Sequence, residues 1–531
     1  MTDYNTNLET IIRTQTGLAL YKQLFVLHMN ARADGVAITY PATDPRTGSG
    51  FENKVLEITV YGDAPASDPV EYPQNWKRKP IPLSYYTDFN GWTFKVSTSQ
   101  LTEDRPLFYL AQDDSAIIAL QNENAVRRES LDNGHFHDHP ILQTGEHLLL
   151  IKDNTPWTYR QELNTSLPTP WSNWNYNTPN LREDVLLIKD GIALNRPIAP
   201  YSTMLSTPLC SYVALDGLKR VMKNVNMVRT ANCEHIINLV SVKLLDDVTI
   251  ENVVVTTPDN INLGHDACIN LLNATNITVK NFSMNKTYCV EASNTYGYGI
   301  QMVNVWNSKF IQVMSNNSVW GFFGCRHVNT AYLENCEINR FDIHYYGRDI
   351  TCVNCTFAPN PVTFNSTIFC NNRFSSLFGN LIYEGCTFNN FMPYFTDYNY
   401  NLYQCFDAYF KGCTFLVKKS SNARIFDLGY WNEPLNYRQE NIRKCAPNVA
   451  LQDCTIKFSS GITEVHLFYL RDQDTITEPI HHVSYISIDN LALKDANNND
   501  LPFTYFKEIN KTVTYDQRVF RFKNKTKVNS F

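Results

Sequence analysis

The chain has 531 residues, of which 43% are hydrophobic and 13% aromatic, and its formal net charge is −6. This composition is typical of a folded protein, and neither the charge nor any basic run indicates a nucleic-acid partner. No stretch approaches the roughly 20 apolar residues of a membrane helix, and the N-terminus, MTDYNTNLETIIRTQ, lacks the apolar core of a secretion signal, so we expect neither membrane insertion nor a signal peptide.

The first 115 residues predict a β-rich N-terminal domain. A short amphipathic helix is expected near Leu8, Ile11 and Ile12. The strand-like runs GVAITY, KVLEITVYG and GWTFKVST come after it, and Pro-, Gly- and Asp-rich turns separate them. We interpret residues 1–115 as a domain distinct from the rest of the chain.

Residues 116–181 are interpreted as a connector that carries a histidine segment, DNGHFHDHP, and ends in a Pro-, Asn- and Trp-rich stretch. His135, His137 and His139 alternate, so on an extended chain their side chains share one face. Imidazoles placed in this way can bind a transition metal. The alternative is a polar loop with three exposed histidines. No cofactor is expected to be required.

A six-residue phrase recurs from residue 222 onward, and its third position is a turn residue between apolar ones. Its copies are MKNVNM, IENVVV, VKNFSM, IQVMSN, LENCEI, CVNCTF, YEGCTF, FKGCTF, LQDCTI and IDNLAL. The third residues are Asn224, Asn252, Asn281, Val313, Asn335, Asn354, Gly385, Gly412, Asp453 and Asn490. Nine of these ten are Asn, Gly or Asp, which tolerate left-handed backbone geometry. The phrase therefore predicts a strand, a tight bend and a second strand.

Repetition of this unit predicts one coil of a parallel β-solenoid per copy, over residues 182–495, with loops in the longer steps. All 14 cysteines lie between Cys210 and Cys454. We expect them to be reduced and buried, with one thiol above another in the narrow interior. Residues 496–531 end in an alternating basic segment, VFRFKNKTKVNSF, which we interpret as a cap or a subunit contact at the open end of the solenoid.

The repeated phrase resembles the right-handed parallel β-helix proteins of the pectin-lyase-like superfamily, and most closely bacteriophage tailspike and tail-fibre proteins. The resemblance implies an all-β fold, a right-handed parallel β-helix preceded by the smaller β-rich N-terminal domain. The resemblance also implies a homotrimer, because phage tail fibres contain similar His-x-His segments in which three chains together hold an iron ion. Fold alone does not settle function, because polysaccharide lyases, glycoside hydrolases and tailspikes share it.

Arg340, Asp342 and His344 are the candidate catalytic residues. By alternation they should face outward together, while Phe341 and Ile343 face the core. One coil later the chain reads Asn-Arg-Phe-Ser-Ser in place of Asn-Arg-Phe-Asp-Ile. The fold therefore does not require the acid and the imidazole, which could serve as a proton-transfer pair. The alternative is a surface hydrogen bond.

Candidate substrate-binding residues come from aromatic loops, because Tyr and Trp rings offer flat apolar faces and polar groups to sugars. Arg340 or Arg348 could hold the carboxylate of an acidic sugar. The alternative for the aromatic residues is packing of the loops on the solenoid. These candidates are Tyr296, Tyr298, Trp320, Arg348, Tyr398 and Trp431.

Three functions remain open. The first is a phage virion appendage that binds host surface polysaccharide, with degradation by a lyase or hydrolase activity undecided, and with other virion proteins as partners. The second is a structural virion protein without catalysis. The third is a free bacterial carbohydrate-active β-helix enzyme, although the motif set of polygalacturonase-like hydrolases is incomplete here. We favour the first and expect the protein in the virion.

Overall fold

The structure is a computed structural model of residues 1–531. It describes residues 3–47, 54–61, 80–99, 105–158, 180–198, 201, 208–230, 237–258, 267–285, 289–290, 295–296, 298–315, 321–357, 373–374, 377–389, 405–417, 424–428, 448–470, 486–509 and 520–523.

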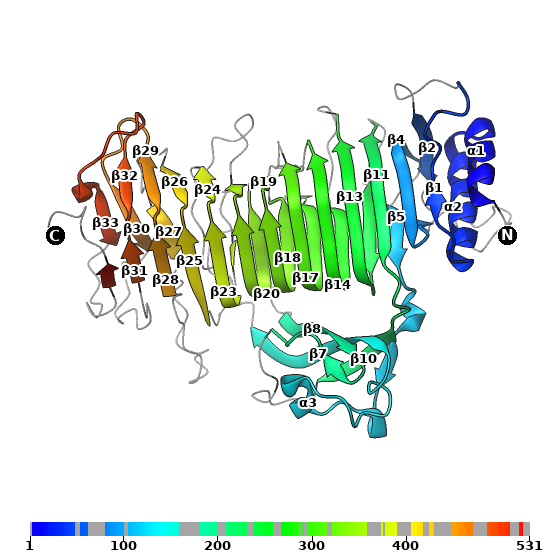
Figure 1. The fold of residues 1–531 in the computed structure, drawn as a ribbon, viewed down its shortest axis with the longest axis horizontal. Coiled ribbons are helices and arrows are strands. Elements are labelled where there is room, and N and C mark those ends of the chain that lie inside the picture. The colour runs from blue at the N-terminus through cyan, green and yellow to red at the C-terminus, as the bar shows by residue number, and fades with distance from the viewer. Residues whose placement is uncertain are drawn as a thin grey trace, which may run out of the picture.

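The predicted fold class is confirmed: successive coils stack into an elongated parallel β-helix (Figure 1). The strands of one coil pair in parallel with the corresponding strands of the next coil, as in the series β13, β14, β17, β18 and β20. The strands of these coils are β11 (Arg220–Arg229), β12 (Ile237–Lys243), β13 (Asp246–Thr256), β14 (Ala267–Met284), β17 (Tyr298–Ser315), β18 (Phe323–Glu334), β19 (Glu337–Ile338), β20 (Phe341–Val353), β21 (Thr356–Phe357), β22 (Arg373–Phe374), β23 (Leu377–Glu384), β24 (Thr387–Asn389), β25 (Cys405–Lys411), β26 (Thr414–Val417), β27 (Arg424–Leu428), β28 (Asn448–Gln452), β29 (Thr455–Phe458), β30 (Val465–Leu470), β31 (Ile486–Asp489) and β32 (Ala492–Lys494). A small hairpin, β15 (Cys289–Val290) and β16 (Thr295–Tyr296), precedes β17.

The predicted bends are present at nine of the ten positions. Asn252, for example, has a φ of +56°, and the glycines at 385 and 412 have φ of +62°. The exception is the weak copy at 311, where Gln312 (φ +54°) and not Val313 makes the bend. Val313 is buried instead. Several bend asparagines form a ladder in which Asn281 donates to Asn252 and Asn252 donates to Asn224, both at 2.8 Å.

The interior holds the predicted column of thiols. Cys336, Cys355, Cys386, Cys413 and Cys454 are buried and free of disulfides. Beside them, the rings of Phe357, Phe388 and Phe415 stack with centroids 5.2 and 5.0 Å apart. Burial raises the pKa of the neighbouring Cys352 thiol. Since all five thiols of the column are buried in the apolar interior, we interpret them as small apolar residues.

The boundary predicted for the N-terminal domain is wrong, because its strands belong to the solenoid. β4 (Tyr86–Ser99) pairs in parallel with β11, and β5 (Arg105–Ala111) pairs with β12. β1 (Ile38–Thr39) and β2 (Val55–Tyr61) pair with β4, and β3 (Ile81–Pro82) pairs with β5. Two helices, α1 (Tyr4–Thr14) and α2 (Gly17–Ala33), pack on these strands and close this end of the core (Figure 1). The sequence predicted α1 but not α2.

His28 of α2 makes this cap sensitive to acid. Its ring is fully buried and hydrogen-bonded to the Tyr40 hydroxyl at 3.1 Å, and burial lowers its pKa from 6.5 to about 3. A depressed histidine pKa means that the unfolded chain takes up the proton first, so stability present above pH 6.5 is lost as the pH falls toward 3. At about pH 5 the loss amounts to about 2 kcal/mol.

Urea unfolding followed by helical circular dichroism at about pH 7 and pH 5 tests this expectation. The wild type should lose about 2 kcal/mol more than His28→Gln, which cannot titrate in this range. Equal pH dependence in the two proteins would contradict a buried neutral imidazole.

A second domain is inserted between β5 and β11 and projects from one side of the solenoid (Figure 1). Its antiparallel sheet has the order β6-β10-β7-β8-β9, and a short helix, α3 (Arg128–Asn133), covers one face. The strands are β6 (Ile118–Leu120), β7 (Glu146–Thr158), β8 (Asn180–Lys189), β9 (Ile192–Ala193) and β10 (Leu209–Ala214). The prediction that residues 116–181 are a connector and that the coils begin at 182 is therefore wrong. The apolar run at 185–188 forms a central strand of this sheet instead of a coil.

The other end of the solenoid extends past the predicted limit of residue 495. β33 (Phe506–Ile509) pairs in parallel with β30, and β34 (Phe520–Lys523) pairs with β31. Between β32 and β33, Leu501 bonds back to Leu493. The region after residue 495 thus supplies further coil strands. The basic residues of the predicted tail beyond Lys523 lie outside the described residues.

Candidate functional site

Asp342 stands in the outward-facing column that alternation predicts. Asn270, Gln301, Gly324 and Asp342 share one register on β14, β17, β18 and β20. Gln301 is exposed, whereas the neighbouring columns that contain Phe341 and Ile343 are fully buried. The direction of the Asp342 side chain was therefore predicted correctly.

The solvent accessibility of Asp342 and of its neighbour Arg340 differs from the prediction. Arg340 and Asp342 are both 0% exposed, so the prediction that they face solvent is wrong. Arg340 Nε donates to Asp342 Oδ2 at 2.6 Å, and Arg340 Nη2 pairs with the same oxygen. The opposite charges of Arg340 and Asp342 neutralise each other, which is what allows both side chains to be buried. In this arrangement neither side chain can reach a ligand.

Tyr298 covers the pair because glycines leave room for its ring. A Cβ atom at Gly324 would lie 2.5 Å from the Tyr298 ring, and one at Gly321 would lie 3.0 Å from Asp342 Oδ2 and 3.2 Å from Tyr298 Cε1. The ring therefore rests directly on Gly324, beside the ion pair, and remains partly exposed. Sequence reasoning found Tyr298 and Asp342 separately. The signal that links them is the pair of glycines flanking Phe322 and Phe323.

His344 occupies an irregular position in β20. Cys325 pairs with Ile343 and Arg326 with Tyr345, so His344 is skipped in the register. Its side chain lies outside the described residues. The catalytic role of Arg340, Asp342 and His344 stays a prediction, and it would require Tyr298 to move away from the ion pair.

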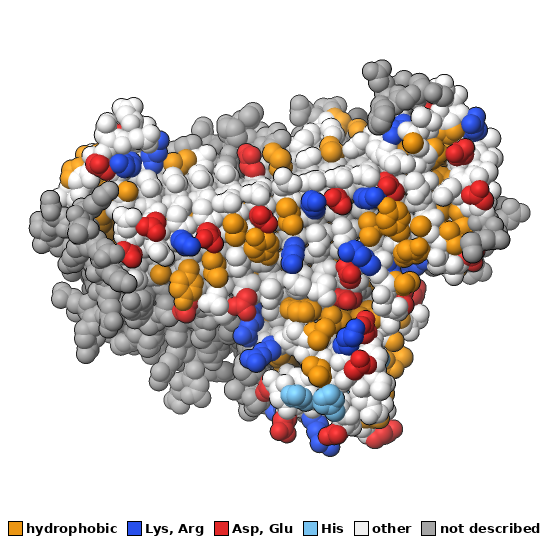
Figure 2. Space-filling model, viewed as in Figure 1, with side chains coloured by type: hydrophobic (Ala, Val, Ile, Leu, Met, Phe, Trp, Pro, Cys, Tyr) orange, Lys and Arg blue, Asp and Glu red, His pale blue; other side chains and the backbone are white. Residues whose placement is uncertain are grey.

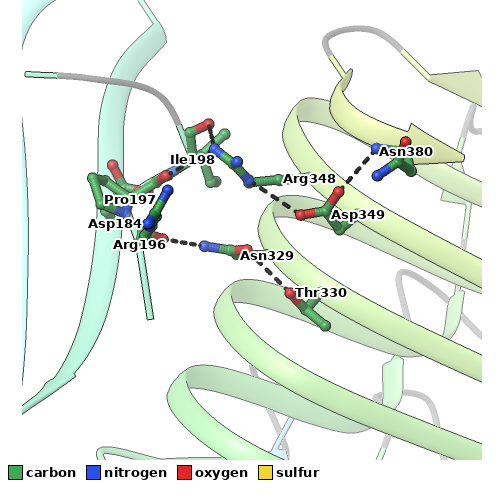
Figure 3. Close-up of polar contacts among 9 residues, drawn as sticks. All are labelled: Asp184, Arg196, Pro197, Ile198, Asn329, Thr330, Arg348, Asp349 and Asn380. Atoms are coloured by element: carbon green, nitrogen blue, oxygen red, sulfur yellow. Dashed lines mark hydrogen bonds and ion pairs between the residues drawn. The ribbon is translucent and has the colours of Figure 1, made fainter. Parts of the chain in front are cut away.

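Arg348 lies at the contact between the solenoid and the inserted domain (Figure 3). Its Nη1 donates to the carbonyl oxygens of Ile198 at 3.1 Å and of Pro197 at 3.4 Å. One coil earlier, Asn329 Nδ2 donates to the carbonyl oxygen of Arg196 at 2.6 Å (Figure 3). The predicted substrate-binding arginine is thus engaged in fastening the two domains.

Apolar contacts complete this junction. Leu244 of the solenoid is buried in one cluster with Leu148, Leu187 and Val213 of the inserted sheet, and Trp306 packs against that cluster. The sheet face that carries these residues therefore lies against the solenoid, while the opposite face packs under α3.

The three predicted metal ligands do not form one group. His139 uses both ring nitrogens within the protein: Nδ1 accepts from the backbone of Ile141 and Leu142 at 3.2 Å, and Nε2 lies 3.1 Å from the Asn124 carbonyl oxygen. His135 and His137 are exposed, with ring centroids 5.9 Å apart. Figure 2 shows histidine side chains at the surface of the inserted domain. Within the described part of the chain, no three potential ligands converge on one point.

Four sequence candidates remain for substrate binding. The backbone of Tyr296 is in β16, but its side chain is outside the described residues, as are all of Trp320, Tyr398 and Trp431. These four stay predictions.

A second outward column, missed by sequence reasoning, brings two tyrosines onto one face of the solenoid. Tyr409 is 42% exposed and Tyr332 is partly exposed. They stand in one register column, three coils apart, or about 14 Å at the usual strand spacing. The column, here called the tyrosine face, comprises Lys309, Tyr332, Thr351, Ile382 and Tyr409.

Each of these tyrosines has a carboxylate at its hydroxyl. Tyr332 Oη donates to Glu334 Oε2, and Tyr409 Oη donates to Asp407 Oδ2, both at 3.3 Å. Partial burial and the neighbouring carboxylate raise the pKa of each phenol. The hydroxyls therefore stay protonated near neutral pH. Each pair offers a flat apolar ring beside strong hydrogen-bond acceptors.

Comparison with known proteins finds likeness in structure only. No protein family and no curated protein matches the sequence. The tailspike protein gp49 from Pseudomonas phage LKA1 aligns with a TM-score of 0.46 and 12% identity, covering 95% of this chain and 71% of that chain. The tailspike gp61 from Pseudomonas phage phi297 aligns with a TM-score of 0.39 and 9% identity, covering 88% and 73%. In the described part of the chain, none of the helices has the length and hydropathy needed to cross a bilayer.

Proposed function

We propose that the chain is a tailspike-like virion protein that binds a host surface polysaccharide along the tyrosine face. The virion setting is supported by the resemblance of the coil repeat to phage β-helix proteins. The observation that carries the binding role is the exposed ring of Tyr409 with Asp407 at its hydroxyl, repeated three coils away by Tyr332 and Glu334.

A polysaccharide suits this arrangement because its sugar units repeat along the chain, as the tyrosine–carboxylate pairs repeat along the solenoid. The aromatic rings can pack against the apolar faces of sugar rings, and the carboxylates can accept hydrogen bonds from sugar hydroxyls. The stacked coils hold the two contacts at a fixed separation on a stiff scaffold, so little conformational freedom is lost on binding. An extended glycan lying along the long axis would contact both tyrosines.

Degradation of the glycan, a homotrimeric assembly and a metal at His135 and His137 belong to this proposal as its finer parts. The second candidate is a structural virion protein without glycan binding, which is favoured by the buried state of Arg340 and Asp342. Reducing-end release from isolated host polysaccharide would separate a cleaving tailspike from a binding one.

We expect the double variant Tyr332→Ala, Tyr409→Ala to bind host polysaccharide about 100-fold more weakly than the wild type, from about 1.4 kcal/mol per lost ring contact. Biolayer interferometry with immobilised host polysaccharide measures this change. The control is Ile118→Ala, which removes a side chain that is 50% exposed on β6 of the inserted domain and is not part of the tyrosine face. It should bind as the wild type does.

Two outcomes would overturn the proposal. Wild-type protein that binds no host polysaccharide would leave the structural virion protein as the better candidate. Undiminished binding by the double variant would move the binding site away from the tyrosine face.

A further inference from the structure

We infer that the glycan bound by the tyrosine face is uncharged rather than polyanionic, an inference that rests on the proposed function. Its grounds are the charges that surround the two tyrosines and the groups that the nearby arginines already bind.

Carboxylates outnumber cations around the face. Glu334 and Asp407 sit at the two tyrosine hydroxyls, and Glu384 lies in the same outward column as Glu334, two coils on. Lys411 neutralises Glu384, with its Nζ 3.0 Å from Glu384 Oε1. Figure 2 shows charged side chains of both signs interspersed with hydrophobic ones along the solenoid, without a basic stripe in that view.

The arginines predicted to hold an acidic sugar are engaged elsewhere. Arg340 is buried against Asp342, and Arg348 donates to two carbonyl oxygens of the inserted domain. A guanidinium fork is the side chain best suited to grip a carboxylate. Among the five residues of the tyrosine face, the one cation is Lys309, which lies one coil before Tyr332.

An acidic glycan would therefore bring its carboxylates toward Glu334 and Asp407. Each close pair of like charges costs about 1 kcal/mol even in water, and an extended polyanion would form several such pairs. A neutral glycan instead offers hydroxyl donors to the same carboxylates, and bonds to an ionised acceptor are the stronger kind. The carboxylates of the tyrosine face therefore favour a neutral glycan over an acidic one, because they repel the first kind less and accept hydrogen bonds from its hydroxyls.

The test uses host polysaccharide separated by anion exchange into neutral and acidic fractions. We expect the wild type to bind the neutral fraction, with a Kd that changes less than about twofold between about 50 and 500 mM NaCl, because screening has little charge attraction to weaken. The acidic fraction should bind at least about tenfold more weakly.

The double variant Glu334→Gln, Asp407→Asn should gain affinity for the acidic fraction and lose affinity for the neutral one. Its control is Glu57→Gln, whose side chain is 75% exposed on β2, far along the chain from the face. This control should leave both affinities unchanged.

The failure of this inference differs from that of the proposed function. Tighter, salt-sensitive binding of the acidic fraction that is still weakened by Tyr409→Ala would overturn the neutral class and keep the binding face. Binding of either fraction that ignores the tyrosine substitutions, or no binding of either, would overturn the binding face and this inference with it.

Discussion

Replacing Asp342 by asparagine is expected to cost about 3–5 kcal/mol of unfolding free energy, because it removes the charge that neutralises a buried guanidinium. Arg340 and Asp342 are both fully buried, and Tyr298 rests beside them on Gly324. Neither water nor another conformation can easily replace the lost carboxylate there. Urea unfolding of the two proteins, followed by tryptophan fluorescence, gives the difference directly.

The chain supplies a matched control. Arg348 and Asp349 form an ion pair at 3.2 Å in which the side chains are 30% and 38% exposed. Asp349→Asn keeps a residue that tolerates the positive φ at this position and should cost at most about 1 kcal/mol.

A double variant separates charge from packing. Arg340→Met combined with Asp342→Leu removes both charges at similar volume and should recover most of the loss. A cost below about 1 kcal/mol for Asp342→Asn alone would show that solvent reaches the pair and that Tyr298 does not cover it. The outward, solvent-facing position expected from the sequence would instead have left folding intact in Asp342→Asn.

Replacing Asn252 by valine is expected to cost about 3 kcal/mol, from two sources. The first is the bend itself: Asn252 has a φ of +56°, which a β-branched residue adopts only with about 1–3 kcal/mol of strain. The second is the ladder, in which Asn252 donates to Asn224 and accepts from Asn281. These exposed bonds contribute about 1 kcal/mol together.

Asn252→Gly divides the two contributions, because glycine adopts the bend without strain but has no side chain for the ladder. We expect it to cost about 1 kcal/mol by the same urea measurement. If glycine and valine destabilised the protein equally, the ladder rather than the bend would account for the effect.

The sequence predicted the solenoid because the bend is a local requirement. A residue that must adopt positive φ is Asn, Gly or Asp in nearly every copy, and the alternation around it marks the inward side chains. The coil of β4 and β5 escaped detection because its bend spans three residues, Phe89–Gly91, between the paired positions Asp88 and Trp92. A pattern built on a one-residue bend does not match it.

The inserted domain was missed for a different reason. The run that forms β8 is apolar and strand-like, and nothing in its composition distinguishes a central antiparallel strand from a coil strand. The neighbouring strand β7 pairs with β8 on one edge and with β10 on the other. Pairing of this kind depends on tertiary contacts and not on local periodicity.

The candidate site was predicted in direction but not in environment. Alternation correctly placed Asp342 outward, yet its burial depends on Tyr298, which is 44 residues earlier in the chain and reaches it through the stacking of coils. The tyrosine face was missed for the same reason. Tyr332 and Tyr409 become neighbours on one face only when the register across four strands is known.

The place where the inserted domain leaves the solenoid is also the place where it returns. The Gln112 side-chain amide donates to the carbonyl oxygen of Ala214 at 3.2 Å, and the Gln112 backbone N–H bonds to Lys243 of the next coil. Entry and exit points that meet in this way let a chain gain, lose or exchange a whole module without breaking the run of coils. Such a change would have to be matched on the solenoid surface, because Leu244 and Trp306 pack against the inserted domain. The coils before and after the insertion therefore stack as one continuous solenoid, and the inserted domain is an addition at its side.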